Sequence, residues 1–527
     1  MKPRTPTRSL AVLLLALAMV AAACGGSSSS SSSGPKGDAK TLKLAFNADM
    51  QVPDPDIFYE VEGNAVVTSV YEGLVRYKPN TTAIEPALAE SWTVSPEGTT
   101  YTFKLRAGVK FADGTPMDAQ SWIVSFKRRT DVNSAPAYML ANVGTTAAPD
   151  PTTFVVTLTK PVTAFLDYMA APYGPKAVSP IVLKDHAGSD FAQNWLKSHS
   201  AGTGPYAIAQ FSPGTKYQLK SNPNYWGSKP YFTAVDISII PDVSTQRLKL
   251  EGGDLDMVMH GLPVSDVEAF RKNPKFTVNE FPALIKTVLA ANPNKGAFKD
   301  KALRLALQHA FDKNKLVEQI YQKQADPSTQ LTPVKVLPTG TAKDPTGVDT
   351  AELKKAVAKI PAPDRNIDMA YSADEGGTIP RLAEVMATTL QDSGLTVKVR
   401  AMPIAQVFDL VNKKDGSSPD LLLWSLNPDA AHPDTWMRIF NGSNAALNFL
   451  ICNVPEGDAK LDQGLSTTDT AASSKAYEDA ADIFEKSGCW TDIADNKEIV
   501  VARKGITGFT HQLPTAYTVR LADLKEG

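Results

Sequence analysis

The residues that could hold a metal ion or act as nucleophiles are scattered through this 527-residue chain. A zinc site on a helix needs histidines one turn apart, and none of the six forms such a pair. The chain also lacks the sequences GxSxG, GxxxxGK[ST], HExxH and CxxC. We therefore expect no metal, no cofactor and no enzymatic activity. The histidines stand at positions 186, 199, 260, 309, 432 and 511.

One apparent cofactor motif is GTGPYA at residues 202–207, which matches the dinucleotide fingerprint G-x-G-x-x-A. That fingerprint must open a helix, whose N-terminus binds the pyrophosphate. Here the chain continues as YAIAQFSPGTKYQLK, and the turn residues Pro213 and Gly214 between two alternating segments predict a hairpin. We therefore reject a nucleotide site at this position.

Residues 366–426 alternate between strand and helix patterns. NIDMAY, LTVKVRAM and DLLLWSL have the composition of strands, and IPRLAEVMATTLQDSG and IAQVFDLVNKK between them predict helices. This order is typical of a parallel α/β unit, in which ligands bind at the carboxyl ends of the strands. One such end is the segment 424–427, which leads into the loop PDAAHPD.

The first third of the chain has a different pattern, with more hairpins. SWTVSPEGTTYTFKLR alternates on either side of a Ser-Pro-Glu-Gly turn, and TTFVVTLTKP predicts a further half-buried strand. Between them, TPMDAQSWIVSFKRR predicts a helix with Thr115 as N-cap and Pro116 in its first turn. The mixture of hairpins with an occasional helix therefore predicts an α+β fold for this region.

The N-terminus resembles a bacterial lipoprotein signal. Residues 1–9 are basic, and the apolar run 10–23 is shorter than the roughly 20 residues that span a bilayer. Cys24 follows at once and is the predicted lipidation site, with ordinary cleavage and a free thiol as the alternative. Residues 24–39 are rich in Gly and Ser and predict a flexible tether.

Charge and length limit the function of the remaining chain. The signal holds three of the 54 Lys and Arg residues, so 51 face 56 Asp and Glu residues after its removal. This acidic balance argues against a nucleic-acid partner. The chain is also too long for one hydrophobic core, so we expect at least two lobes. In an exported chain Cys452 and Cys489 are predicted to form a disulfide, with two buried free thiols as the alternative.

Four segments, in order, resemble the peptide/nickel/opine family of extracytoplasmic solute-binding proteins, which supply ABC importers. They are YEGLVRYKPN, PALAESWTVSPEGTTYTFKLRAGVKFADGTPMDAQSW, GTGPYAIAQFSPGTKYQLKSNPNYWGSKPY and FKDKALRLALQHAFDKNKLV. The resemblance implies a mixed α/β and α+β fold, the two-lobed periplasmic-binding-protein clamshell of type II (cluster C), with an inserted subdomain in the first lobe. It also implies that the lobes close on a short peptide or similar polar solute and deliver it to the permease and ATPase subunits of an importer.

The same resemblance implies the domain boundaries. The signal covers 1–23, the tether 24–39, the first lobe 40–284 with its subdomain at about 78–200, the second lobe 285–504, and the return to the first lobe 505–527. The two crossings are expected near 281–291 and 501–508. We expect a monomer, held at the outer face of the bacterial cytoplasmic membrane by its lipid alone.

The resemblance also directs attention to the loop after Trp424. In peptide-binding members an aspartate three residues after this tryptophan pairs with the amino terminus of the peptide, but here that position is Asn427. A neutral amide forms hydrogen bonds but supplies no charge to an ammonium. Asp429 and Asp434 are therefore the candidates to replace it, and Ser425 is a further candidate.

Two other segments are expected to face the cleft, and they add Phe58, Tyr59 and His260 as candidates. Each candidate has a structural alternative, because Trp424 could be core, His260 a turn or surface residue, and Asp429 and Asp434 caps of turns. Two other functions stay open. One is a receptor or tethering protein that uses the same clamshell, and the less favoured one is a lipid-anchored hydrolase.

Overall fold

A mixed sheet of eleven strands runs through the part of the chain that the computed structural model describes, which is residues 40–337, 347–373, 378–412 and 418–527. The predicted signal, Cys24 and the tether lie outside these residues. The strands of the eleven-stranded sheet are, in spatial order, β15 (Thr396–Met402), β14 (Asn366–Ser372), β16 (Leu421–Leu426), β12 (Phe276–Ala291), β17 (Trp490–Arg503), β11 (Met257–Val258), β1 (Thr41–Phe46), β10 (Ala234–Ile239), β9 (Lys216–Ser221) and β8 (Tyr206–Ser212). The remaining strand, β13 (Ala325–Pro327), pairs with β17 outside this order.

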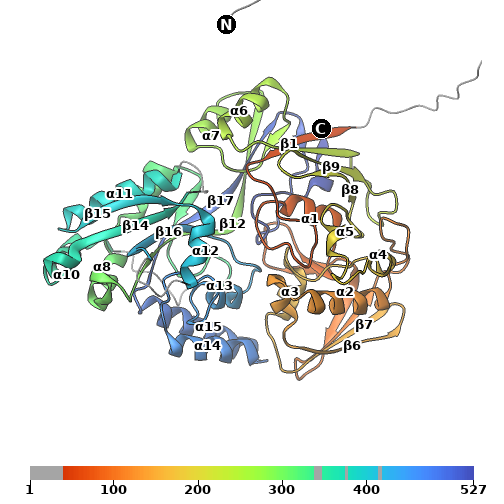
Figure 1. Cartoon of the computed structure of the whole chain (residues 1–527), viewed down its shortest axis with the longest axis horizontal. Coiled ribbons are helices and arrows are strands. Elements are labelled where there is room, and N and C mark those ends of the chain that lie inside the picture. The colour runs from red at the N-terminus through yellow and green to blue at the C-terminus, as the bar shows by residue number, and fades with distance from the viewer. Residues whose placement is uncertain (1–39, 338–346, 374–377, 413–417) are drawn as a thin grey trace, which may run out of the picture. The chain divides into compact units, whose positions relative to one another are not determined.

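The two long strands β12 and β17 form the middle of this sheet (Figure 1). They are antiparallel and pair from Phe276 opposite Arg503 to Ala290 opposite Trp490, with a register shift between Pro282 and Lys286. One end of β17 contributes to one hydrophobic core and the other end to a second core. Both strands therefore join two separately packed lobes.

The first lobe contains the larger core and carries the predicted hairpins. SWTVSPEGTTYTFKLR forms an antiparallel pair, and the predicted strand TTFVVTLTKP adds to it, so both predictions are confirmed. YAIAQFSPGTKYQLK is also a hairpin, which removes the structural basis of a nucleotide site. The small sheets consist of β4 (Ala89–Val94), β5 (Thr100–Leu105), β7 (Thr153–Leu158) and β6 (Val143–Asp150), of β2 (Val75–Tyr77) and β3 (Ile84–Pro86), and of β18 (Ile506–Thr507) and β19 (Lys525–Glu526).

The second lobe contains the predicted parallel unit. Strand β14 pairs in parallel with β15 on one side and with β16 on the other. Helix α11 (Thr378–Asp392) connects β14 to β15 and buries Leu382, Met386 and Leu390 in the second core. The strand–helix alternation of residues 366–426 is thus confirmed, since its order and parallel pairing match the prediction.

Helices cover both lobes within the described residues. Their bounds are α1 (Asn64–Val70), α2 (Ala119–Val132), α3 (Phe165–Ala170), α4 (Pro180–Asp185), α5 (Gln193–Leu196), α6 (Val243–Gly252), α7 (Val264–Arg271), α8 (Lys301–Gln308), α9 (Lys313–Leu316), α10 (Thr350–Ala358), α12 (Ile404–Phe408), α13 (Pro433–Phe440), α14 (Pro455–Ser466) and α15 (Thr470–Glu485). In the ranges that the structure describes, no helix combines the length and the apolar composition that a membrane span requires.

The predicted N-cap of α2 is wrong by three residues. Asp118 caps this helix, because its carboxylate accepts from the Ser121 amide at 2.9 Å while the Ser121 hydroxyl faces the Asp118 amide. Thr115 lies in the preceding turn, where its own amide donates to the Asp113 carboxylate. Asp118 and Ser121 form a reciprocal capping box, which satisfies more backbone groups than Thr115 could.

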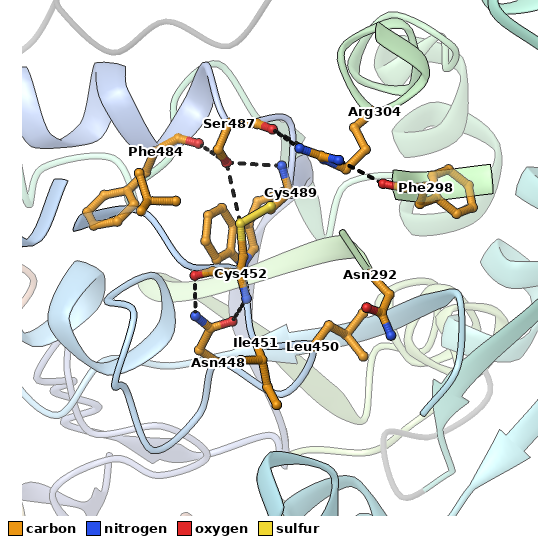
Figure 2. Close-up of a disulfide and its surroundings, with 12 residues drawn as sticks. Asn292, Phe298, Arg304, Asn448, Leu450, Ile451, Cys452, Phe484, Ser487 and Cys489 are labelled. Atoms are coloured by element: carbon orange, nitrogen blue, oxygen red, sulfur yellow. Dashed lines mark hydrogen bonds between the residues drawn. A yellow bond between two sulfur atoms is a disulfide. The ribbon is translucent and has the colours of Figure 1, made fainter. Parts of the chain in front are cut away.

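A disulfide joins Cys452 to Cys489, as predicted (Figure 2). It links the loop after α13 to the start of β17 across 37 residues, which include α14 and α15. Both sulfurs lie in a buried cluster beside Phe484 and Trp490. The Asn448 side chain exchanges two hydrogen bonds with the backbone of Cys452 and so fixes the loop that carries it.

Candidate functional site

The loop 427–434 connects β16 to α13 and lies against the first lobe. It begins where β16 ends, passes His432, the N-cap of α13, and ends in the first turn of that helix; the His432 Nδ1 accepts from the Asp434 amide. Burial lowers the pKa of His432 to about 4, so this ring is neutral and suited to accept. Proline in the first turn and the cap at His432 fix the direction in which the chain leaves the loop.

Asp429, at the centre of this loop, receives two tyrosine hydroxyls from the first lobe. Tyr59 donates to its Oδ2 at 2.5 Å and Tyr138 donates to the same oxygen at 2.6 Å. Burial and the nearby Asp429 charge raise the pKa of both tyrosines well above the usual value, so both remain protonated donors. Asp429 thus contacts both tyrosines of the first lobe through one carboxylate oxygen.

Asp429 has no cationic partner among the described residues. Its side chain is 6% exposed, and burial raises its pKa to about 6 although both tyrosines lower it. A buried carboxylate without a counter-charge is costly, because protein hydrogen bonds replace only part of its hydration. The arrangement is therefore suited to a cation that arrives from outside the protein.

Two further tyrosines of the first lobe contact the same loop. The Tyr77 hydroxyl accepts from the Ala431 amide at 3.0 Å, and Tyr168 donates to Asp434 at 3.4 Å. Asp434 differs from Asp429 because Arg438, one helical turn further on, forms an ion pair with it at 2.9 Å. Its charge is compensated within the protein, so Asp434 is less suited to bind a cationic ligand.

Tyr59 is positioned by a buried ion network at the end of α2. Arg128 binds Asp54 with both terminal nitrogens, and it shares Asp56 with Arg129. All four side chains are at least 96% buried. Because bidentate pairing fixes geometry, this network holds the loop 51–60 and the tyrosine on it in one place.

Asn427 lies at the start of the loop and contacts the returning chain. Its Nδ2 donates to the carbonyl oxygen of Pro428 and, at 3.2 Å, to that of Pro514. Its Oδ1 is buried, and no described residue donates to it. A free acceptor thus stands two residues from the uncompensated Asp429.

Trp424 and Ser425 lie on opposite faces of β16. The indole packs on Phe449 with ring centroids 4.4 Å apart and on Phe408 at 6.0 Å, and it is half-buried. The Ser425 hydroxyl faces that of Thr287 on β12. Trp424 also lines a small apolar cavity next to the disulfide, whose walls include Phe449, Cys452, Cys489 and Trp490.

The two remaining candidates are Phe58 and His260. Phe58 is buried in the first core and packs on Tyr173. His260 stacks on Tyr517, and its Nε2 is 3.1 Å from Glu62, whose charge raises the pKa of the histidine against the effect of burial. No group of His, Cys, Asp or Glu within the described ranges could hold a metal ion.

Comparison with known proteins identifies the family of this chain. The model of the bacterial extracellular solute-binding proteins, family 5 Middle, matches residues 83–448. The chain belongs to this family. As a family 5 protein it is a non-enzymatic solute-binding component of ABC import that acts outside the cytoplasm, with the two-lobed fold that its cores indicate.

Several relatives resemble this family 5 protein along most of their length. The probable D,D-dipeptide-binding periplasmic protein DdpA of Escherichia coli K12 is 29% identical over 469 residues, which cover 88% of this chain and 90% of that protein. The glutathione-binding protein GsiB of E. coli strain 536 is 25% identical, with coverages of 92% and 95%. The solved structure of DppA from Helicobacter pylori, in complex with peptide STSA, has a TM-score of 0.79 at 22% identity and covers 92% and 98%.

Of the first-lobe tyrosines that contact the loop 427–434, only Tyr59 was predicted from the sequence. Tyr138 is 291 positions away from Asp429 along the chain, so no local spacing connects the two. Tyr77 lies within YEGLVRYKPN, one of the four family segments, but nothing in that segment indicates a contact with Ala431. Only the packing of the two lobes brings these residues together.

Proposed function

We propose that this family 5 protein captures a short peptide, or a similar polar solute with a free amino group, between its two lobes and delivers it to an ABC permease. The observation that carries the proposal is Asp429, a buried carboxyl group at the junction of the lobes without a cationic partner among the described residues. The amino group of the solute would supply the missing charge. Asn427 Oδ1, an unused acceptor, would take one of its hydrogen bonds.

The relatives support this ligand class. The names of DdpA and GsiB refer to a D,D-dipeptide and to glutathione, and both ligands carry a free α-amino group. The Tyr59 and Tyr138 hydroxyls donate to Asp429 Oδ2, and an ammonium would share this oxygen with them or replace them. Charge-assisted hydrogen bonds are stronger than those from neutral hydroxyls, which favours the exchange.

We further propose that the lobes close by bending at β12 and β17. The first lobe would comprise 40–284, with a subdomain at about 78–200, and the return segment 505–527, while the second lobe would comprise 285–504. The support is that β12 and β17 each reach from one core to the other, and that the Pro282–Lys286 register shift interrupts their pairing near the proposed crossing. Few residues would then have to change conformation during closure.

The first test is thermal stabilisation of the mature protein by a panel of di- to pentapeptides. At a hundredfold excess over Kd, a peptide that binds only the folded state adds about 2.7 kcal/mol to the free energy of unfolding. We expect the midpoint to rise with free-amine peptides and much less with their N-acetylated forms. If free and acetylated peptides leave the midpoint unchanged alike, the proposed ligand class is wrong.

We also propose that Cys24 carries a lipid that holds the protein at the membrane. The support for this proposal is the lipoprotein-like N-terminus. Stable anchoring requires more than one acyl chain, so the lipid on Cys24 would have to carry at least two. The C24S variant is expected to move from the membrane fraction to the soluble exported fraction, with unchanged peptide binding. Equal partition of C24S and the unaltered protein would contradict the anchor.

A further inference from the structure

A groove with a volume of about 660 Å³ lies between the two lobes, beside the loop 427–434. Its first-lobe wall includes Tyr101, Thr163 and Asp167, and its second-lobe wall includes His432 and Tyr477. The lobes meet at this groove, where the Thr163 amide donates to the Leu465 carbonyl oxygen at 2.9 Å. Its volume is within the range of roughly 300–1,000 Å³ that is typical of small-molecule sites.

Asp167 is the carboxyl group of this wall, and it is linked to the loop that carries Asp429. Tyr77 donates to its Oδ1 at 2.7 Å, while the Tyr77 hydroxyl accepts from the Ala431 amide at 3.0 Å. Two hydrogen bonds thus connect Asp167 to a residue two positions from Asp429. The groove and the Asp429 site therefore meet at one loop.

No cation of the described chain compensates Asp167. The structure gives it no ion pair, and burial raises its pKa to about 7 against the opposing effect of the Tyr77 hydroxyl. His432 on the opposite wall is neutral because burial lowers its pKa to about 4. Lys335, which also lines the groove, is exposed to solvent and forms no ion pair with Asp167.

We propose that Asp167 binds a second cationic group of the solute, so that the preferred ligand is a peptide with a basic side chain. The inference rests on the proposed function, in which Asp429 holds the amino terminus. A lysine or arginine side chain that enters the groove would pair with Asp167. The Thr163 and Tyr477 hydroxyls of the walls already donate to Gly464 and Asp434, and they would accept hydrogen bonds from the amides of the peptide.

The test compares tripeptides that differ only in one ammonium group. Calorimetry at pH 8 would measure the Kd of Ala-Lys-Ala and Ala-Ala-Lys against the same peptides with norleucine in place of lysine. We expect at least one lysine peptide to bind ten times more tightly than its norleucine counterpart. In D167N that ratio should fall below two, while the affinity of the norleucine peptides stays within a factor of two.

Two control variants keep the test specific. D185N removes an exposed carboxylate at the end of α4 in the same lobe and should keep the tenfold ratio. S474W fills the groove from the α15 wall without altering Asp167, and it should abolish the lysine preference even if D167N folds poorly.

The outcomes separate the two proposals. Equal affinity of the unaltered protein for lysine and norleucine peptides, with normal free-amine binding, would overturn the role of Asp167 and leave the role of Asp429 intact. A lysine preference that persists in both D167N and S474W would overturn it as well. If neither set of peptides binds the unaltered protein, the proposed function itself fails, and the inference fails with it.

Discussion

Replacement of Asp429 by asparagine is expected to weaken the binding of a free-amine peptide by about 30-fold or more. Truncating one partner of a buried charge pair costs about 2–5 kcal/mol, and 2 kcal/mol corresponds to roughly 30-fold in Kd. The amide keeps the size of the side chain and can still accept from Tyr59 and Tyr138, so the junction of the lobes should be preserved. The loss should therefore be one of charge, measurable by calorimetry at pH 8.

Acetylated peptides and a matched carboxylate provide the controls for D429N. N-acetyl peptides lack the ammonium and should bind the variant and the unaltered protein with similar, weak affinity. D482N removes a carboxylate from the exposed side of α15, where it pairs with Lys486, and should leave all affinities unchanged. A D429N protein that still discriminates between free and acetylated peptides would exclude Asp429 as the partner of the amino group.

The pH dependence of binding gives a second measure of the same group. Because burial raises the pKa of Asp429 to about 6, the carboxylate that an ammonium requires is lost as the pH falls through that value. Affinity for free-amine peptides should drop up to tenfold per pH unit below about 6, and D429N should lack this change. The stability of the fold changes in the opposite direction, since the raised pKa of Asp429 contributes stability below pH 3.8 that is lost as the pH rises through 6.

The elements of the second lobe were predictable because their signals are local. The alternation of apolar residues in LTVKVRAM and the apolar face of IPRLAEVMATTLQDSG each lie within one element, and both formed as predicted. Thr115 was the predicted cap of α2, whereas Asp118 caps this helix in the structure. Only the reciprocal contact with Ser121 decided between them.

The site itself was only partly predictable. The loop after Trp424 emerged from the family resemblance, and Asp429 within it was one of two alternatives. The choice between Asp429 and Asp434 depends on Arg438. This arginine pairs with Asp434 because α13 places the two residues one helical turn apart. The tyrosines of the first lobe and the groove beside Asp167 depend on how two distant lobes pack, which a single sequence does not encode in any local pattern.

Removal of the disulfide by the double change C452A/C489A is expected to destabilise the second lobe by about 4 kcal/mol. The bond closes a loop of 37 residues, and chain entropy in the unfolded state predicts a cost of this size. Alanine leaves no buried hydroxyl next to Phe484 and Trp490, so the loss should come from the missing bond and a small cavity. Calorimetric unfolding of the mature protein measures the change.

The effect should extend to the ligand site, because the disulfide anchors the loop that carries Phe449. That ring packs on Trp424, and both line the cavity next to Cys452 and Cys489. A looser loop would let Trp424 move at the end of β16, and we expect a several-fold loss of peptide affinity together with the loss of stability. Treatment of the unaltered protein with a thiol reductant should reproduce both losses and should not affect C452A/C489A further. Equal unfolding midpoints of the oxidised and reduced protein would show that the disulfide stabilises neither the lobe nor the site.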